Sequence, residues 1–393
     1  MKLFLNDCGI VCALGDSVAQ VRERLFAGQS GIAPTSQWSP GRELPLGRVL
    51  SALPDVSQRV LADRSRNNQL ALAALAQIRT SVDAAIGRYG AHRVGIVIGT
   101  STSGVSETEA AMAEHVKGAG MPESFHYAQQ EMGAPALMLA RELGVTGPAY
   151  VHSSACASGA KALASAARMI NMGLCDAVVT GGADSLCAFT VAGFSALESV
   201  SAARCNPLSA NRNGINIGEG AALFLMTREA SAVALCGWGE ASDGHHMSAP
   251  DPAGSGARIA INAALARAGI TAGQVDYINL HGTATLQNDA MESRVVADLF
   301  GSAVAVSSTK PFTGHALGAA AALEAAFCWI AMQDDNAEGM LPPHLWDGAQ
   351  DSALPALNVA ATGSRLGRPL AWALSNSFAF GGSNAALVLG RGR

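Results

Sequence analysis

The sequence predicts an α/β fold built from two related halves. Continuous apolar runs at residues 94–99, 176–180 and 304–308 have the composition of strands that are covered on both faces of a sheet. They alternate with segments that carry apolar and small residues at helical spacing, at residues 67–89, 158–172, 257–268 and 318–332. Strands that alternate with helices in this way favour a sheet that is flanked by helices.

Two pairs of segments resemble each other and indicate an internal duplication. AYVHSSACASGAKALASA, from residue 149, resembles AVAVSSTKPFTGHALGAAAA, from residue 303. VGIVIGTSTSG, from residue 94, resembles VDYINLHGTAT, from residue 275. A mixture of strand and Gly- and Pro-rich loop at residues 230–255 marks the break. We therefore predict halves at residues 1–235 and 236–393.

Composition argues against several classes of protein. The 393 residues carry a formal net charge of −5, which argues against a general affinity for nucleic acid. The eight cysteines are irregularly spaced without a CxxC pair, which disfavours a disulfide framework and a structural zinc site. The first residues form too short an apolar run for a signal peptide, and residues 319–332 are too few for a membrane helix. We expect a cytoplasmic protein without a membrane span.

Cys156 stands where an apolar strand is expected to turn into an Ala-rich helix. Unpaired N–H groups and the helix dipole at such a position favour a thiolate over a thiol. The same amides can hold the oxyanion of a tetrahedral intermediate. Taken alone, each cysteine of the chain is more often a small buried hydrophobe.

Two histidines and a lysine elsewhere in the chain could act together with Cys156. His281 follows an expected strand in HGTAT, while Lys310 and His315 flank the turn in KPFTGH. Histidine in such places can donate a hydrogen bond or move a proton near neutral pH. The spacing is wrong for a structural zinc site, and the glycines after residue 99 fit neither a dinucleotide-binding nor a phosphate-binding motif. The pattern indicates acyl transfer on thioesters.

The segment SNSFAFGGSN, residues 375–384, has two glycines after an aromatic residue, which suits a loop that presses against a ligand. Phe380 could wall an apolar pocket while its N–H faces a carbonyl oxygen. Phe378 fits a core position equally well.

Four motifs resemble the β-ketoacyl-acyl-carrier-protein synthases, the elongating condensing enzymes of fatty acid and polyketide assembly. They are ACASG around Cys156, HGTAT, KPFTGHALGAA and SFAFGGSN, in the order and spacing of that family. GEGAALFLM and GFSALESVS are similar to the family as well. The resemblance spans nearly the whole chain. It implies a thiolase-like fold with two pseudo-symmetric halves in five αβαβα layers, usually as a dimer.

The resemblance also implies a reaction. Cys156 would accept an acyl group from the phosphopantetheine thioester of an acyl carrier protein. Malonyl-carrier protein would then lose carbon dioxide, and the carbanion would attack the acyl-enzyme. His281 and His315 would stabilise the enolate-like charge, with Lys310 polarising His281. The amides of Cys156 and Phe380 would form the oxyanion hole.

Other matched residues would bind substrate or support the site. Thr283 and Thr285 would hydrogen-bond the pantetheine arm. The acyl pocket would be bordered by Phe194, Phe378 and Phe380. The supporting residues, which surround a monovalent cation in some relatives, are Asn279, Glu324, Ser375 and Asn376. Beyond such a structural cation we expect no resident cofactor and no catalytic metal, because phosphopantetheine arrives on the carrier protein.

Three departures from the family pattern qualify the resemblance. Ala284 stands where the family often has Gly or Ser, and Ala379 stands where glycine is usual; the added methyl reduces backbone freedom. NRNGIN places Asn213 and Ile215 where an acid-bearing motif is usual. These variants are similar to the branch found with aryl-polyene pigment clusters, which extends unsaturated aromatic chains.

Other functions of the same fold compete with elongation. A thiolase or a priming synthase shares the cysteine, although a priming synthase pairs it with His and Asn. A non-catalytic chain-length-factor partner typically lacks the cysteine. A Cys-based hydrolase would leave Lys310 and one histidine without a role.

The expected partners are acyl- and malonyl-carrier proteins, with the chain as a homodimer or as a heterodimer with a synthase-like protein. Carrier protein is acidic, so we expect docking on a basic patch. The candidates are Arg59, Arg64 and Arg66. Acyl chain length and saturation do not follow from the sequence.

Overall fold

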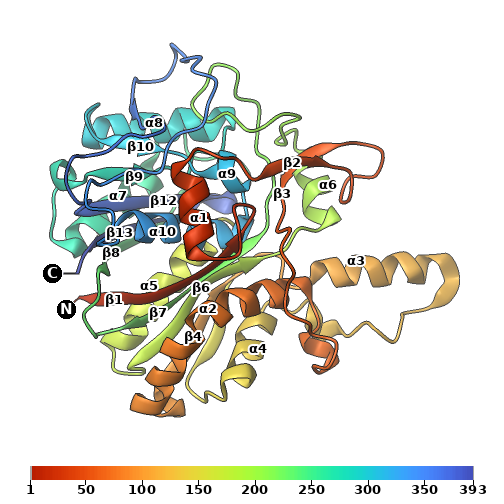
Figure 1. The fold of residues 1–393 in the computed structure, drawn as a ribbon. Helices are drawn as coiled ribbons and strands as arrows, with labels where there is room; N and C mark the ends of the chain where they lie inside the picture. The colour runs from red at the N-terminus through yellow and green to blue at the C-terminus, as the bar shows by residue number, and fades with distance from the viewer. Residues whose placement is uncertain (1, 393) are drawn as a thin grey trace.

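The computed structural model describes residues 2–392 and joins strands from both halves of the chain in one mixed sheet (Figure 1). Within these residues the sheet has 11 strands in the order β11-β10-β9-β12-β13-β8-β1-β7-β6-β4-β5. β2 (Ile32–Thr35) and β3 (Leu44–Gly47) form a separate antiparallel pair.

The first half supplies one end of this sheet and the helices on it. Its strands are β1 (Leu3–Cys12), β4 (Val94–Gly99), β5 (Ala149–His152), β6 (Ala177–Asp184) and β7 (Gly220–Thr227). Its helices are α1 (Val18–Phe26), α2 (Arg66–Tyr89), α3 (Val105–Glu114), α4 (Ala134–Leu143), α5 (Ser158–Asn171) and α6 (Ala188–Ala196). α3 projects from the body as an arm (Figure 1).

The second half supplies the other end of the sheet. Its strands are β8 (Val233–Ser242), β9 (Tyr277–Asn279), β10 (Ala305–Ser307), β11 (Asn358–Val359), β12 (Trp372–Ala379) and β13 (Ser383–Arg391). Its helices are α7 (Ser255–Ala268), α8 (Leu286–Phe300), α9 (Lys310–Thr313) and α10 (Ala320–Ala331), the last preceded by a 3₁₀ turn, Leu317–Ala319.

The two halves repeat one strand order, so the predicted duplication is confirmed. The first half reads β5-β4-β6-β7-β1 and the second reads β10-β9-β12-β13-β8. In both, the first two pairings are parallel and the next two antiparallel. The segments that resemble each other in sequence occupy equivalent places, β4 with β9 and β5–α5 with β10–α10. The boundary after residue 235 stays a prediction, and β8 begins at Val233.

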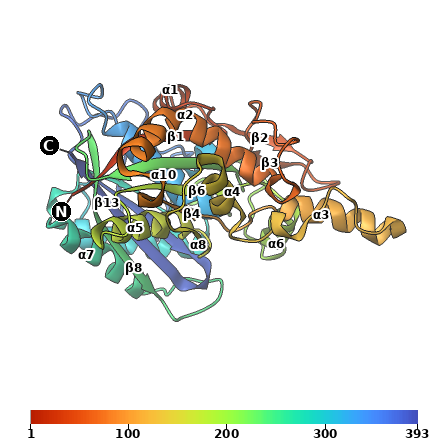
Figure 2. The same ribbon diagram turned by 90° about the horizontal axis from the view of Figure 1, so that it is seen from below.

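The layers follow the expected αβαβα order. α2 and α4 cover the outer face of the first half, and α7 and α8 cover that of the second. α5 and α10 lie between the halves, and Figure 2 shows α2 and α7 on opposite sides of this stack. A Cβ on Gly159 would lie 2.8 Å from the backbone N of Ala322, so the two middle helices approach as closely as glycine allows.

α2 is the one helix within residues 2–392 whose length and mean hydropathy would suffice to cross a membrane. Its N-terminus is capped by Ser65, whose side chain accepts a hydrogen bond from the Asn68 N–H. Its apolar face, which includes Leu70, Leu75 and Ile78, packs against the strands of the first half. In this structure α2 is therefore a core helix.

Candidate active site

Cys156 lies at the turn that leads from β5 into α5, as predicted. Ala155, directly before it, adopts a left-handed backbone with φ 48°, which turns the chain sharply ahead of the helix. The thiol-bearing residue is 5% exposed. The turn thus presents the sulfur at the N-terminal end of the middle helix layer.

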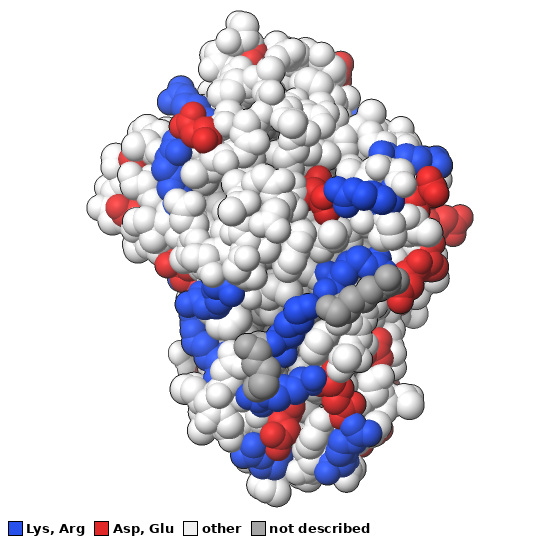
Figure 3. Space-filling model, turned by 90° about the vertical axis from the view of Figure 1, so that its left-hand side faces the viewer, with Lys and Arg blue, Asp and Glu red and all other residues white. Residues whose placement is uncertain are grey.

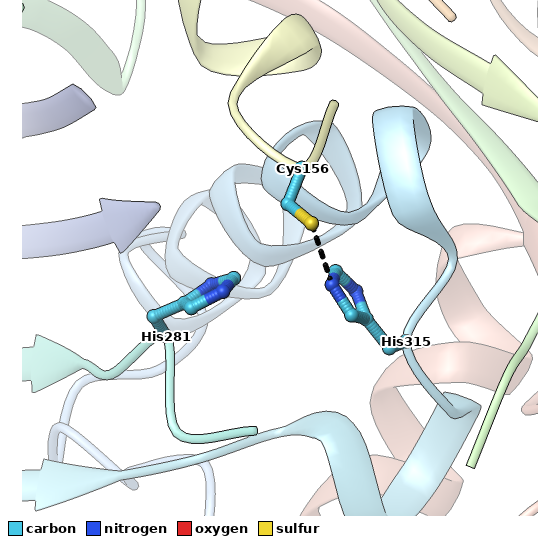
Figure 4. Close-up of side chains that lie close together, drawn as sticks. All are labelled: Cys156, His281 and His315. Atoms are coloured by element: carbon cyan, nitrogen blue, oxygen red, sulfur yellow. Dashed lines mark hydrogen bonds between the residues drawn. The ribbon is translucent and has the colours of Figure 1, made fainter. Parts of the chain in front are cut away.

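The structure brings both predicted histidines to this sulfur (Figure 4). His315 Nε2 lies 2.9 Å from Cys156 Sγ. The rings of His281 and His315 are 5.4 Å apart, centroid to centroid, at an interplanar angle of 83°. Cys156 comes from the first half and both imidazoles from the second, so the site forms only where the halves meet.

Lys310 is buried beside His281 and is paired with Glu324. Its Nζ lies 2.5 Å from Glu324 Oε1 and 2.5 Å from the carbonyl oxygen of His281. Burial raises the pKa of Glu324 to about 7, although Lys310 favours the charged carboxylate. Glu324 is thus the counter-charge of Lys310.

Lys310 also sets the tautomer of His281. Its Nζ is 3.4 Å from Nδ1 of that ring, and an ammonium group can only donate, so we assign the ring proton to Nε2. Nε2 is then a hydrogen-bond donor toward substrate. The nearest ligand atoms of Cys156, His281 and His315 lie within 4.8 Å of one another, yet a protonated Nε2 cannot ligate a metal. The arrangement therefore suits oxygen recognition better than a metal site.

Burial decides the protonation states at the centre of the site. It raises the pKa of the Cys156 thiol to about 12, although Lys310 and the N–H groups of Phe380 and Cys156 favour the thiolate. Burial and the Lys310 charge hold the pKa of both histidines well below the usual range. The amides at the helix N-terminus favour the thiolate, as expected, but loss of water outweighs them in the resting site. Cys156 and His315 form a neutral pair.

Two backbone amides converge on the sulfur, as the predicted oxyanion hole requires. The N–H groups of Phe380 and of Cys156 itself both interact with Sγ. Phe380 belongs to the turn between β12 and β13, where Gly381 (φ 80°) and Gly382 (φ 71°) have left-handed backbones. Glycine adopts this backbone without strain.

The site opens into a pocket that both halves of the chain line. Thr283 and Thr285 line it with their hydroxyl oxygens 2.9 Å apart. The predicted aromatic residues line it too: the Phe194 and Phe380 rings are 5.5 Å apart. Phe378 serves both interpretations given above, because it belongs to the core of the second half and its ring lies 6.1 Å from that of His281.

The supporting residues lie on adjacent strands and on α10. Ser375 pairs with Asn279 in the register of β12 and β9. Four of their buried oxygen atoms lack a hydrogen-bond partner within residues 2–392, namely Asn279 Oδ1, Ser375 Oγ, Asn376 Oδ1 and Glu324 Oε2. Such oxygens can serve as ligands of a hard cation.

Two buried carboxylates that the sequence reasoning missed hold the loops of the site. Glu292 on α8 accepts hydrogen bonds from the His281 N–H (2.8 Å) and the Gly282 N–H (2.7 Å). Asp184, at the end of β6, accepts from the Ser101 N–H (2.9 Å) and the Gly318 N–H (2.6 Å). The available signal was an acidic residue on an apolar helix face or at an apolar strand end.

The departures from the family pattern have different structural effects. Ala284 has φ 65°, a left-handed backbone that strains a residue with a Cβ. Ala379 has φ −104° and ψ 155°, an extended backbone that any residue adopts. In the NRNGIN segment, Arg212 pairs with Asp351 at 2.6 Å, and Ile215 lines the pocket.

The arginines predicted to dock a carrier protein are largely engaged within the chain. Arg66 pairs with buried Glu219 at 2.5 Å, and Arg59 pairs with Glu142 at 2.7 Å. Arg64 Nε donates to the Arg59 carbonyl oxygen. Internal carboxylates thus compensate two of the three charges, and docking at these residues stays a prediction.

Lys and Arg side chains also gather in an interrupted band on the face shown in Figure 3, with Asp and Glu beside them. Charges of both signs therefore lie side by side on this face, and the figure gives no reason to replace the predicted docking residues.

Comparison with known sequences identifies the family. The profile described as beta-ketoacyl synthase, N-terminal domain, matches residues 8–232, and that of the C-terminal domain matches residues 232–345. The chain belongs to the β-ketoacyl synthase family. This synthase is 32% identical to nodulation protein E of Rhizobium sp. (strain N33), with 98% of each chain covered. It is 29% identical to 3-oxoacyl-[acyl-carrier-protein] synthase 2 of Vibrio cholerae serotype O1, with 99% of each covered.

Solved structures agree with this assignment. The synthase superposes on a chain in the structure of the ketosynthase ApeO in complex with its chain length factor ApeC from Xenorhabdus doucetiae, with a TM-score of 0.93. That match has 43% identity and covers 99% of this chain and 98% of the other. A β-ketoacyl synthase from Burkholderia phymatum STM815 matches over 100% of both chains with a TM-score of 0.87 and 28% identity. The thiolase-like fold is thus confirmed, and the synthase is a condensing acyltransferase.

Proposed function

We propose that this synthase elongates an acyl chain held as a thioester on Cys156, using malonyl-carrier protein as the two-carbon donor. The observation that carries the proposal is the contact of 2.9 Å between Cys156 Sγ and His315 Nε2 in a pocket that the His281 ring shares. A neutral thiol beside a neutral imidazole becomes a nucleophile when its proton moves to Nε2.

The first half-reaction loads the enzyme. The thiol proton moves to His315 Nε2 while sulfur attacks the acyl carbonyl of acyl-carrier protein. The amides of Cys156 and Phe380 hold the oxyanion. The carbon–sulfur bond to the pantetheine arm breaks, and the proton on His315 returns to the departing thiolate.

The second half-reaction forms the new carbon–carbon bond. Malonyl thioester loses carbon dioxide, and its carbonyl oxygen takes the resulting negative charge. The His281 Nε2–H, oriented by Lys310, donates to that oxygen, and His315 does so too once its Nε2 has taken up a proton from solvent. The carbanion attacks the acyl carbon on Cys156, and the departing thiolate takes that proton from His315.

Mass spectrometry of the intact protein tests the assignment of the nucleophile. After incubation with acyl-carrier protein, wild type should gain one acyl mass, and Cys156→Ala should gain none and form no β-ketoacyl product. Cys236→Ala is the matched control, because it removes a half-buried thiol that does not line the pocket. Condensation by Cys156→Ala at the wild-type rate would reject the mechanism.

The substrate that we propose is an unsaturated, aryl-ended chain of the aryl-polyene type. The likeness to the structure that contains ApeO, at 43% identity, supports this choice, as does a pocket bordered by Phe194, Phe378 and Phe380. Aromatic side chains favour stacking on a flat conjugated chain. Acylation with a matched panel of polyene and saturated carrier-protein thioesters tests it, and equal rates would argue against it.

A synthase-like partner is part of the proposal. The match that supports it is a ketosynthase complex with a chain length factor. The projecting α3 arm supports it as well, because Met112 (45%) on α3 and Val116 (79%) and Met121 (43%) in the segment just after it are exposed. Sedimentation of the chain alone and with candidate partners would show whether it forms a homodimer or a heterodimer.

We propose a cytoplasmic location, which eight free thiols support.

Asn279, Ser375, Asn376 and Glu324 would hold a structural monovalent cation, because their unpartnered oxygens fit such an ion. The ion would neutralise part of the buried negative charge, and it takes no part in the steps above. Thermal unfolding in potassium against choline salts tests this. We expect potassium to raise Tm in wild type and not in Asn376→Leu.

The other acyl-transfer alternatives, a priming synthase or thiolase, are disfavoured because both histidines and Lys310 lie together.

A further inference from the structure

Lys161 makes a contact that the proposed mechanism does not use. It lies on α5, five positions after Cys156, and is half-buried. Its Nζ donates to Ser383 Oγ at 2.6 Å. Within residues 2–392 no carboxylate lies within 4.0 Å of this ammonium group. This ammonium group therefore contacts a neutral hydroxyl rather than a counter-charge.

Ser383 ends the turn that carries the oxyanion amide of Phe380. Two backbone contacts of this turn come from the second half. Asp243 N–H donates to the Gly382 carbonyl (2.8 Å), and the Gly381 N–H donates to the Met247 carbonyl (2.8 Å). From the first half, the sulfur of Cys156 meets the Phe380 N–H, and Lys161 adds a side-chain contact through the helix that begins beside Cys156.

The oxyanion hole depends on the distance between these two elements. One of its amides belongs to Cys156 at the start of α5, and the other belongs to Phe380 in the turn. Left-handed Gly381 and Gly382 give the turn a wide range of accessible backbone conformations. A bond from α5 to Ser383 limits that range where the hole needs a fixed spacing, and a displacement of about 1 Å can lower a rate by about 100-fold.

We propose that Lys161 is a positioning residue that holds the Phe380 amide in register with the Cys156 amide through Ser383 Oγ. This inference rests on the proposed acyl transfer at Cys156. Lys161 acts through the hydroxyl and the turn, and it contacts neither substrate nor the reacting sulfur.

The test compares a reaction that needs the oxyanion hole with one that does not. Acylation of Cys156 by acyl-carrier protein passes through an oxyanion, whereas alkylation by iodoacetamide does not. Lys161→Met and Ser383→Ala should each lower the acylation rate about 10-fold, and the double variant should lose no more than either alone. The alkylation rate should change less than about twofold.

Two further variants separate positioning from folding and from charge. Ser383→Thr keeps the hydroxyl, so its acylation rate should remain close to that of wild type. Arg294→Met removes one positive charge from an exposed site on α8 and should leave both rates unchanged.

If Lys161→Met and Ser383→Ala were acylated at the wild-type rate, the positioning role of Lys161 would be rejected while the proposed function would stand. The same holds if the alkylation rate fell as much as the acylation rate. If wild type itself gained no acyl mass, the proposed function would fail together with the positioning role of Lys161.

Discussion

The two halves of the synthase share backbone turns at equivalent places but carry different chemistry on them. Ala155 (φ 48°) lies three positions before α5, and Leu317 (φ 46°) lies three positions before α10. The next residue is Cys156 in the first half and Gly318 in the second. The first turn thus presents a nucleophile, whereas the second donates its Gly318 N–H to Asp184.

The second half has an extra segment at this place. Between the end of β5 and Ala155 there are only Ser153 and Ser154, whereas α9 lies between β10 and Leu317. That longer segment contains Lys310 and His315. The duplication therefore supplied the scaffold twice, and an inserted turn in one copy carries the charge and one of the two imidazoles.

The largest expected effect comes from removing the charge that this inserted turn provides. Lys310→Met leaves Glu324 buried without a counter-charge, which should lower the free energy of unfolding by about 3–5 kcal/mol. The double variant Lys310→Met/Glu324→Leu should recover most of that loss in chemical denaturation. Condensation should stay abolished in both, because the tautomer of His281 is no longer held. Recovered activity in the double variant would contradict this role.

A smaller effect distinguishes activation by the helix from activation by the imidazole. Burial raises the pKa of the Cys156 thiol to about 12. As long as the pH stays below that value, each unit by which the pH rises increases the thiolate fraction tenfold. The rate of iodoacetamide alkylation should therefore rise about 100-fold between pH 7 and pH 9. Mass spectrometry reports it, with Cys156→Ala correcting for other thiols. A plateau below pH 8 would mean that the helix start of the first half forms a stable thiolate by itself.

The smallest expected effect is a change in the free energy of unfolding when an alanine with a left-handed or an extended backbone is replaced by glycine. Ser103 (φ 46°) and Ala284 (φ 65°) are aligned between the halves in the turns after β4 and β9. Ala284→Gly should raise the free energy of unfolding by about 1 kcal/mol, because glycine relieves the strain of this backbone. Ala379→Gly should lower it by about 0.5–1 kcal/mol, because the extended backbone there gains nothing from glycine. Thermal or urea unfolding measures both, and effects of equal sign would contradict the comparison.

The arrangement of strands and helices was predictable from local pattern. Residues 94–99 form β4 as predicted, and the helices predicted at 67–89 and 158–172 differ from α2 and α5 by one residue at one end. Periodicity and turn residues act over short distances, so a single sequence contains this information. The meeting of Cys156 with His281 and His315 required the family resemblance, because these residues come from opposite halves.

Effects that depend on the surroundings in space were not predictable. The pKa of Cys156 depends on how much water the second half excludes from it, and no local motif reports that. The ion pair of Arg66 with Glu219 joins residues 153 positions apart. This ion pair engages the Arg66 guanidinium, which the sequence analysis had assigned to docking of a carrier protein. Glu292 and Asp184 were missed for the same reason, because their donors lie on distant loops.

The shared middle layer has a consequence for dividing this molecule. α5 and α10 each come from one half, and together they fill the space between both halves of the sheet. A fragment cut at the junction would expose one of these alanine-rich surfaces to water and should aggregate unless its complement is synthesised beside it. Neither repeat is thus an exchangeable module, and recombination between relatives should succeed only when both sides of that seam are inherited together.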